Sequence, residues 1–239
     1  MSRTAMITGA SRGIGEAIAR RFAAAGYDLV LTCINNIDKM EQIAEELKIN
    51  NKVSARCYKA DMGDEESVVR IFDDIDGVDV LINNAGVSYV GLLQDMSYED
   101  WNRVMSTNLD SIFLTCRLAV KRMLHMHEGR IINISSMWGN VGASMEVAYS
   151  ASKGGVNAFT RALAKELSPS NIQVNAIACG VIDTDMNGHL SPQEREELTL
   201  QIPAGRYGEP AEVAELAYML ATAPAYLTGQ IITMDGGML

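Results

Sequence analysis

The chain lacks long apolar runs, a visible leader and any flexible linker, and each absence excludes a class of protein. Charge or glycine interrupts every apolar stretch well before the roughly 18 residues of a membrane-spanning helix, so we expect no membrane span. The first residues, MSRT, lead directly into a strand-like run, which indicates no signal peptide. No Pro-, Gly- or Ser-rich linker divides the 239 residues, and 48% of them are hydrophobic, which is enough for the core of one large domain.

Paired cysteines and clustered basic residues are also missing. The four cysteines form no C-x-x-C pair, which argues against a zinc site or a redox dithiol and favours reduced thiols in a cytoplasmic protein. The formal net charge is -10 at pH 7, and no Lys/Arg cluster that could bind phosphates is evident. We therefore expect neither a metal nor a nucleic-acid partner.

What the chain does contain is an alternation of short apolar runs and amphipathic stretches. Strands are expected over residues 4–8, 28–33, 53–60, 78–82, 130–134, 173–178 and 230–234. Helices are expected over residues 14–25, 39–47, 65–75, 101–126 (as one helix or two), 148–167 and 211–221. This order predicts a single α/β domain over residues 1–239, a Rossmann-like doubly wound parallel sheet with helices on both faces.

Residues 185–207 break this alternation. They have weak strand character, a helix start at Ser191-Pro192, and glycines at 188 and 205 near the two ends. A connection of this length that is not part of the sheet is typical of a functional loop. We expect it to form a small lid over a site.

A glycine-rich segment lies between the first expected strand and the first expected helix. Residues 8–15 read TGASRGIG, a G-x-x-x-G-x-G pattern. Glycine lets the backbone turn tightly and approach a pyrophosphate, and a helix N-terminus offers free N–H groups with partial positive charge. The segment therefore predicts a dinucleotide site that includes Gly9, Ser11, Arg12, Gly13, Ile14 and Gly15.

The end of the second expected strand indicates which dinucleotide binds. Residues 33–36 read CINN, without the Asp or Glu that would bind the ribose 2′-hydroxyl of NAD. Arg12 could meet a 2′-phosphate instead, or simply be a solvated loop arginine. We expect NADP(H) in preference to NAD(H), with Asn35 among its contacts.

Tyr149 and Lys153, with Ser136 thirteen residues before the tyrosine, can move a proton to or from a carbonyl–alcohol pair. Residues four apart on a helix project from one face, so the ammonium would lie beside the phenol and favour its ionised form. An unperturbed phenol has a pKa of about 10, too high for proton exchange at neutral pH without such a neighbour. The same spacing also occurs in ordinary helices, so the other motifs must decide whether this pair is catalytic.

Residues 83–86, NNAG, complete a set of motifs that resembles the short-chain dehydrogenase/reductase family over essentially the whole chain. The set comprises the glycine pattern, NNAG, Asn108, Ser136, Tyr149-x-x-x-Lys153 and the terminal Asp235-Gly236-Gly237, in the family's order. The resemblance implies an oxidoreductase in which Tyr149 is the general acid and Ser136 hydrogen-bonds the ketone oxygen. It implies that Lys153 binds the nicotinamide ribose and lowers the tyrosine pKa, and that Asn108 supports a water-linked proton relay.

The same resemblance assigns further cofactor contacts. It places Asp61 and Met62 at the adenine, although Asp61 could equally be a helix cap. The other contacts that it implies are Asn83, Ala85, Gly86, Tyr149, Lys153, Gly180, Ile182 and Thr184. Cys179 replaces the family's usual proline, and we expect a small buried residue there rather than a reactive thiol. The resemblance also implies a homotetramer.

The segments IPAGR at 202–206 and TGQ at 228–230 resemble the 3-oxoacyl-acyl-carrier-protein reductase branch, which reduces a β-ketoacyl thioester with NADPH. Docking of an acidic carrier protein favours arginines beside the active-site mouth, and the corresponding positions here are His127 and Ser170. Glu146, three residues before Tyr149, suits a cationic substrate better than an acyl chain.

Two alternatives follow. Residues 135–144, SSMWGNVGAS, resemble a subgroup that reduces the 5-aminopentanone group on a lysine of elongation factor P, whose amine would suit Glu146. Trp138 would then line the pocket, or pack on its own loop. The second alternative is an NADP-binding regulatory module without turnover, which the presence of Ser136, Tyr149 and Lys153 disfavours. Both the acyl-carrier-protein and the elongation factor P interpretations imply a ketone substrate carried on a protein. The identity of that substrate and the reaction direction stay open.

Overall fold

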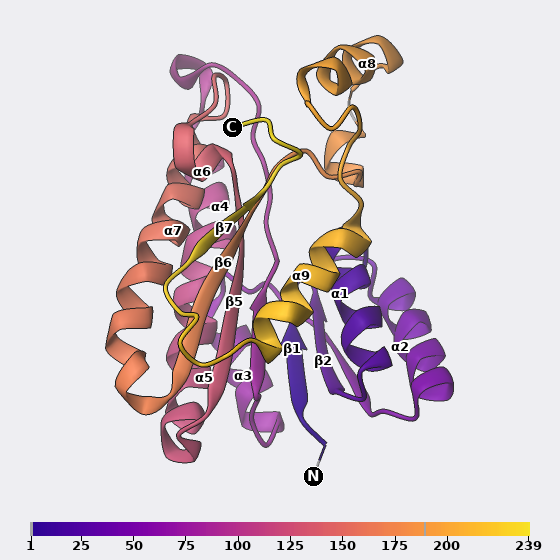
Figure 1. Ribbon diagram of the computed structural model, residues 1–239, viewed down its shortest axis with the longest axis vertical. Coiled ribbons are helices and arrows are strands. Elements are labelled where there is room, and N and C mark those ends of the chain that lie inside the picture. The colour runs from indigo at the N-terminus through magenta and orange to yellow at the C-terminus, as the bar shows by residue number, and fades with distance from the viewer. Residues whose placement is uncertain (1, 189) are drawn as a thin grey trace.

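The computed structural model describes residues 2–188 and 190–239, and a seven-stranded sheet forms its centre (Figure 1). The strand order is β3-β2-β1-β4-β5-β6-β7, and every neighbouring pair is parallel. The strands are β1 (Thr4–Ile7), β2 (Asp28–Cys33), β3 (Ala55–Lys59), β4 (Val80–Asn83), β5 (Gly129–Ser136), β6 (Ile172–Cys179) and β7 (Ile231–Met234). The predicted doubly wound α/β fold is confirmed.

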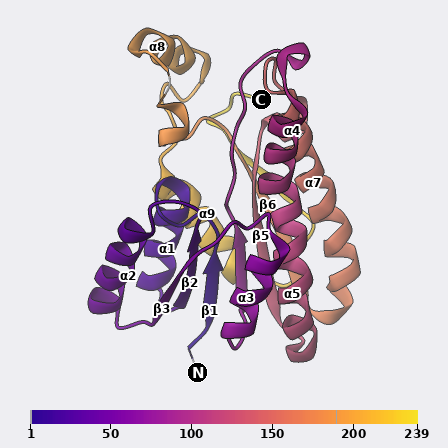
Figure 2. The same cartoon turned by 180° about the vertical axis from the view of Figure 1, so that it is seen from behind.

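Helices cover both faces of the sheet (Figures 1 and 2). One layer consists of α1 (Gly13–Ala24), α2 (Ile37–Asn51) and α9 (Pro210–Thr222). The other consists of α3 (Glu65–Asp74), α4 (Tyr98–Met105), α5 (Ser111–Met126) and α7 (Val147–Leu167). A separate hydrophobic core lies between each layer and the sheet, so β4 and β6 are buried along their whole length. This burial explains why the strands appear in the sequence as continuous apolar runs.

The helical stretch predicted over residues 101–126 is two helices joined by a π turn, η2 (Ser106–Asp110). A π turn inserts one residue into the helical ladder and is frequent at functional sites. The inserted turn carries Asn108, which is completely buried.

Residues 180–188 and 190–207 rise above the carboxyl edge of the sheet, where α8 (Pro192–Gln201) stands apart from both helix layers (Figure 1). The helix starts where expected, because Ser191 and Glu194 form a capping box. No residue of α8 is buried. Before it lies the short turn η4 (Asp185–Asn187), and His189, inside the predicted lid, lies outside the described residues.

Candidate active site

A cavity of about 730 Å³ lies at the carboxyl ends of β1, β2 and β4. This edge of a doubly wound sheet, where the strand order reverses, is where such folds bind ligands. Most residues predicted to bind the cofactor line this cavity, namely Gly9, Ser11, Arg12, Gly13, Ile14, Asn35, Asp61, Met62, Ala85, Gly86 and Thr184. The structure thus brings residues from five separate segments of the chain together at one site.

The glycine loop has the geometry that a pyrophosphate requires. Gly9 adopts φ +68°, and helix α1 begins without any side-chain cap, so the N–H groups of its first turn are available to an anion. Asn84 fastens this loop to the one after β4, because its Nδ2 donates to the carbonyls of Thr8 (2.9 Å) and Gly9 (3.1 Å). The residues present therefore fit a dinucleotide.

Six predicted cofactor residues do not line the cavity: Gly15, Asn83, Tyr149, Lys153, Gly180 and Ile182. Gly15 packs against the Gly9 carbonyl instead. Asn83 is buried and donates from Nδ2 to Asn133 Oδ1 (2.9 Å), while its Oδ1 accepts from Thr115 (2.8 Å). Since both ends of this amide are used inside the core, Asn83 joins β4 to β5 and α5.

Sequence reasoning missed other lining residues: Thr32, Cys33, Ile34, Asn36, Lys59, Ala60, Asn84, Val87, Thr107, Asp185 and Met186. Most follow or end a parallel strand, and that position was the available signal. Asp185 is the notable one, because its carboxylate pairs with the guanidinium of Arg12 at 3.1 Å while both side chains stay more than half exposed. The helix-cap interpretation of Asp61 is wrong, since Asp64 caps α3 and Asp61 accepts from the backbone N–H of Gly63.

Three of the four predicted catalytic side chains come from two elements. Ser136 ends β5, whereas Tyr149 and Lys153 lie one turn apart on α7. Lys153 Nζ stands 5.7 Å from the Tyr149 ring centroid and donates to the carbonyl oxygen of Ile134 (2.8 Å). A side chain at Gly86 would come within 3.5 Å of this Nζ, so the glycine marks where the cavity meets the catalytic group.

Asn108 holds this end of the site together. Its Oδ1 accepts from the N–H of Val87 (2.8 Å), and its Nδ2 donates to the Val87 carbonyl (2.9 Å) and to Ser152 Oγ (3.0 Å). The buried side chain therefore fixes the loop after β4 against the helix that carries Tyr149. The amide lies on the π turn η2 and is completely buried.

Burial sets the protonation of the catalytic groups. It raises the pKa of the Tyr149 phenol; a hydrogen bond with Ser136 opposes this shift, while Cys179 and Glu146 add to it. Burial also lowers the pKa of Lys153 to about 8. The net direction for Tyr149 is opposite to the expected lowering by Lys153, because desolvation disfavours both charged forms. A phenol that stays protonated at neutral pH is suited to donate a proton.

Trp138 and Glu146 border the catalytic group from the segment before α7. Trp138 begins the short helix α6 (Trp138–Val141), is partly exposed, and donates from its backbone N–H to Ser136 Oγ (3.2 Å). Glu146 immediately precedes α7, and its Oε1 accepts from Ser88 Oγ (2.7 Å). The carboxylate therefore already has a hydrogen-bond partner within the protein.

Two sequence-based arguments about neighbouring residues have clear outcomes. Cys179 is buried opposite Ser136 in the sheet, and burial raises the pKa of its thiol to about 12, so the interpretation as a small core residue is confirmed. His127 and Ser170 lie just before the amino ends of β5 and β6. Ser136 lies at the opposite end of β5, seven residues after its first residue, which is roughly 23 Å along a strand. Placing them at the mouth of this chain's own site was wrong.

Lys153→Met is expected to stabilise the protein at pH 7 while it removes activity. Because the folded pKa is about 8 and the ordinary one 10.5, the unfolded chain binds more protons between these values, and stability rises with pH across that window. Methionine removes the cost of burying the charge, about 1–3 kcal/mol. Urea unfolding at pH 7 and pH 10 measures the gain in stability and its dependence on pH. Lys165→Met, on the exposed part of α7, should change neither, and a destabilised Lys153→Met protein would contradict the argument.

Comparison with known proteins agrees with this geometry. A family profile described as short chain dehydrogenase matches residues 3–195. The chain is 39% identical to 3-oxoacyl-[acyl-carrier-protein] reductase FabG of Aquifex aeolicus, over 99% of this chain and 97% of that protein. It is 37% identical to the uncharacterized oxidoreductase YmfI of Bacillus subtilis, over 99% of both chains.

Solved structures give the same result. The crystal structure of 3-oxoacyl-[acyl-carrier protein] reductase from Brucella melitensis aligns with a TM-score of 0.93 at 34% identity, covering 99% of this chain and 91% of that one. YwfH, an NADPH dependent reductase involved in bacilysin biosynthesis, aligns with a TM-score of 0.93 at 28% identity, covering 100% and 99%.

The chain belongs to the short chain dehydrogenase family, and it is an oxidoreductase acting on ketone or alcohol groups. Within residues 2–188 and 190–239, none of the helices is both long and apolar enough to cross a bilayer. The described residues also contain no cluster of three His, Cys, Asp or Glu side chains that could bind a metal ion.

Proposed function

We propose that the protein reduces a 3-oxoacyl thioester, carried on an acyl carrier protein, to the 3-hydroxyacyl thioester with NADPH. The observation that carries this proposal is the grouping of Tyr149 with Lys153, whose Nζ lies 5.7 Å from the tyrosine ring centroid, beside Ser136 and at the end of a cavity that fits a dinucleotide. The full-length similarity to two reductases of that name supports the choice of substrate.

Each residue has a separate task in this reaction. A bound reduced nicotinamide would supply the hydride to the ketone carbon. Tyr149, protonated at neutral pH, gives its proton to the ketone oxygen, and Ser136 hydrogen-bonds the same oxygen as negative charge develops on it. Lys153, one of whose protons goes to the Ile134 carbonyl, would bind the nicotinamide ribose with its remaining donors, and Asn108 keeps the loop after β4 in place.

The test is oxidation of NADPH with acetoacetyl thioesters of an acyl carrier protein and of coenzyme A. We expect turnover with both. Absence of turnover with every ketone, together with intact NADPH binding, would instead support the non-catalytic NADP-binding module.

A second candidate, reduction of the 5-aminopentanone group on elongation factor P, rests on Glu146 and on the resemblance of residues 135–144. The carboxylate lies one turn before Tyr149, where it could attract a terminal amine. Its hydrogen bond with Ser88 shows that it also has an internal partner. The two candidates separate in a competition assay, because Glu146→Gln would lower activity on the aminopentanone substrate far more than activity on the acetoacetyl thioester.

Arg12→Ala is expected to lower kcat/KM for NADPH about tenfold and to leave kcat/KM for NADH nearly unchanged. The guanidinium borders the cavity beside Asn35, and the loop after β2 carries no acid that would repel a 2′-phosphate. Steady-state kinetics with both cofactors measures the ratio. Arg70→Ala, exposed on α3 and away from the cavity, serves as the control. Equal losses with both cofactors would contradict a 2′-phosphate contact.

We also propose that residues 185–207 form a lid and that the chain assembles as a homotetramer. The pair formed by Arg12 and Asp185 supports the lid, because it joins the glycine loop to this segment.

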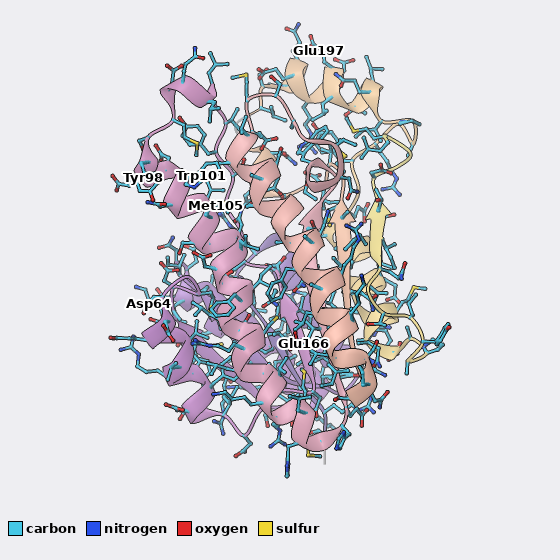
Figure 3. All side chains as sticks on the ribbon, turned by 90° about the vertical axis from the view of Figure 1, so that its left-hand side faces the viewer. Asp64, Tyr98, Trp101, Met105, Glu166 and Glu197 are labelled. Atoms are coloured by element: carbon cyan, nitrogen blue, oxygen red, sulfur yellow. The ribbon has the colours of Figure 1, made fainter. Side chains whose placement is uncertain are left out.

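The layer formed by α4, α5 and α7 supports the assembly (Figure 3). Large apolar side chains are exposed there, with Tyr98 at 79% and Phe113 at 47%. Light scattering tests the assembly, and a monodisperse monomer would contradict it.

A further inference from the structure

The loop after β4 is attached to the segment before α7 at two points. Ser88 Oγ donates to Glu146 Oε1 (2.7 Å), and the backbone N–H of Gly91 donates to the carbonyl of Met145 (2.8 Å). Residue 87, next to Ser88, is the one that Asn108 holds through both its N–H and its carbonyl. Gly86 and Val87 of the same loop line the cavity. The position of this cavity wall therefore depends on the start of α7.

The segment before α7 is itself constrained. The Glu146 carbonyl accepts from the N–H of Ser150 (2.8 Å), which starts the helix that carries Tyr149. Met145 has φ +63°, a left-handed conformation that a residue with a Cβ rarely adopts unless its surroundings impose it. The Met145 carbonyl accepts from the N–H of Gly91, and the next residue, Glu146, accepts from Ser88, so this segment is held on both residues.

We propose that Glu146 is a positioning residue: its carboxylate fastens the loop after β4 to the start of α7, and its negative charge lies one helical turn before the phenol of Tyr149. This inference rests on the proposed function for its kinetic readout, but not for its spectroscopic one. The internal hydrogen bond gives the carboxylate a use that requires no cationic substrate.

The charge acts on the proton that Tyr149 donates. Among the titratable groups around the phenol, Glu146 before α7 and Cys179 on β6 contribute to its raised pKa, and Lys153 Nζ on α7 lies 5.7 Å from its ring centroid, while the neutral Ser136 on β5 opposes the shift. A carboxylate opposes ionisation of a nearby phenol, and Glu146 contributes to the raised pKa of Tyr149. Glutamate at this position therefore helps to keep the Tyr149 phenol protonated.

Two variants separate the attachment from the charge. Ser88→Ala removes the hydrogen bond and keeps the carboxylate, so we expect KM for the ketone to rise about fivefold or more with an unchanged pH profile. Glu146→Gln keeps an acceptor oxygen for Ser88 and removes the charge. We expect its pH profile of alcohol oxidation to shift by about half a unit or more to lower pH, with little change in KM.

Glu166→Gln, which removes a charge near the other end of α7 (Figure 3), is the matched control and should shift neither quantity. The phenol of Tyr149 is also titrated directly, by ultraviolet difference absorbance against Tyr149→Phe. An unshifted phenol titration in Glu146→Gln, or an unchanged KM in Ser88→Ala, would overturn the proposal. If no 3-oxoacyl thioester is turned over, the proposed function fails, and the absorbance titration still decides whether Glu146 acts on Tyr149.

Discussion

Tyr149→Phe is expected to lower kcat for ketone reduction about 10³-fold while the Kd for NADPH stays near that of the wild type. Phenylalanine fills the same volume but has no proton to give, so negative charge developing on the ketone oxygen would be met by Ser136 alone. Single-turnover measurement of NADPH oxidation isolates this step, and fluorescence titration of NADPH shows whether the cofactor site is intact.

The control for this substitution is Tyr98→Phe. Tyr98 is 79% exposed on α4 (Figure 3) and is remote from the cavity, so loss of its hydroxyl should leave kcat unchanged. Full activity in Tyr149→Phe would exclude the general-acid role. A parallel loss of NADPH binding would show that the phenol acts on the cofactor instead.

Gly15→Ala is expected to have the second large effect, a loss of about 3 kcal/mol in the free energy of unfolding together with loss of measurable NADPH binding. A Cβ at this position would overlap the backbone carbonyl of Gly9 and lie 2.6 Å from Asn84 Nδ2. Neither group can move away cheaply, because Asn84 is the side chain that holds the glycine loop to β4. The added methyl would therefore push apart the two loops that form the cavity.

Thermal unfolding and calorimetric titration with NADPH measure the two losses. Ala24→Ser, at an exposed position near the end of the same helix, controls for the general effect of changing α1. A Gly15→Ala protein with wild-type stability and wild-type NADPH affinity would show that the glycine loop can rearrange at little cost.

Several elements could be predicted from residues alone, and for a physical reason. Strands buried on both faces appear as continuous apolar runs, and α1 begins within its glycine pattern, so the order of strands and helices was available from local sequence. Element ends were less accurate: β3 spans Ala55–Lys59 rather than residues 53–60, and α2 extends to Asn51. Such ends depend on caps and on tertiary packing more than on periodicity.

The site was predictable in part. Ser136, Tyr149 and Lys153 have fixed spacings, and the structure places them on β5 and α7 as one group. The role of Asn83 was not predictable, because its partners Asn133 and Thr115 are 50 and 32 residues away in sequence. The same holds for the pairing of Ser88 with Glu146, 58 residues apart. No local pattern reports contacts of this range.

The sequence by itself determined the fold class and the family and supplied the proposed catalytic side chains, because hydrophobic periodicity and motif spacing are local properties. Only the tertiary structure decided what surrounds those side chains. Burial, which results from the packing of the whole domain, raises the pKa of Tyr149 and lowers that of Lys153, in place of the simple two-residue effect that the spacing suggested. Glu146 shows the same difference, because its hydrogen bond with Ser88 exists only once the loop after β4 has folded against α7.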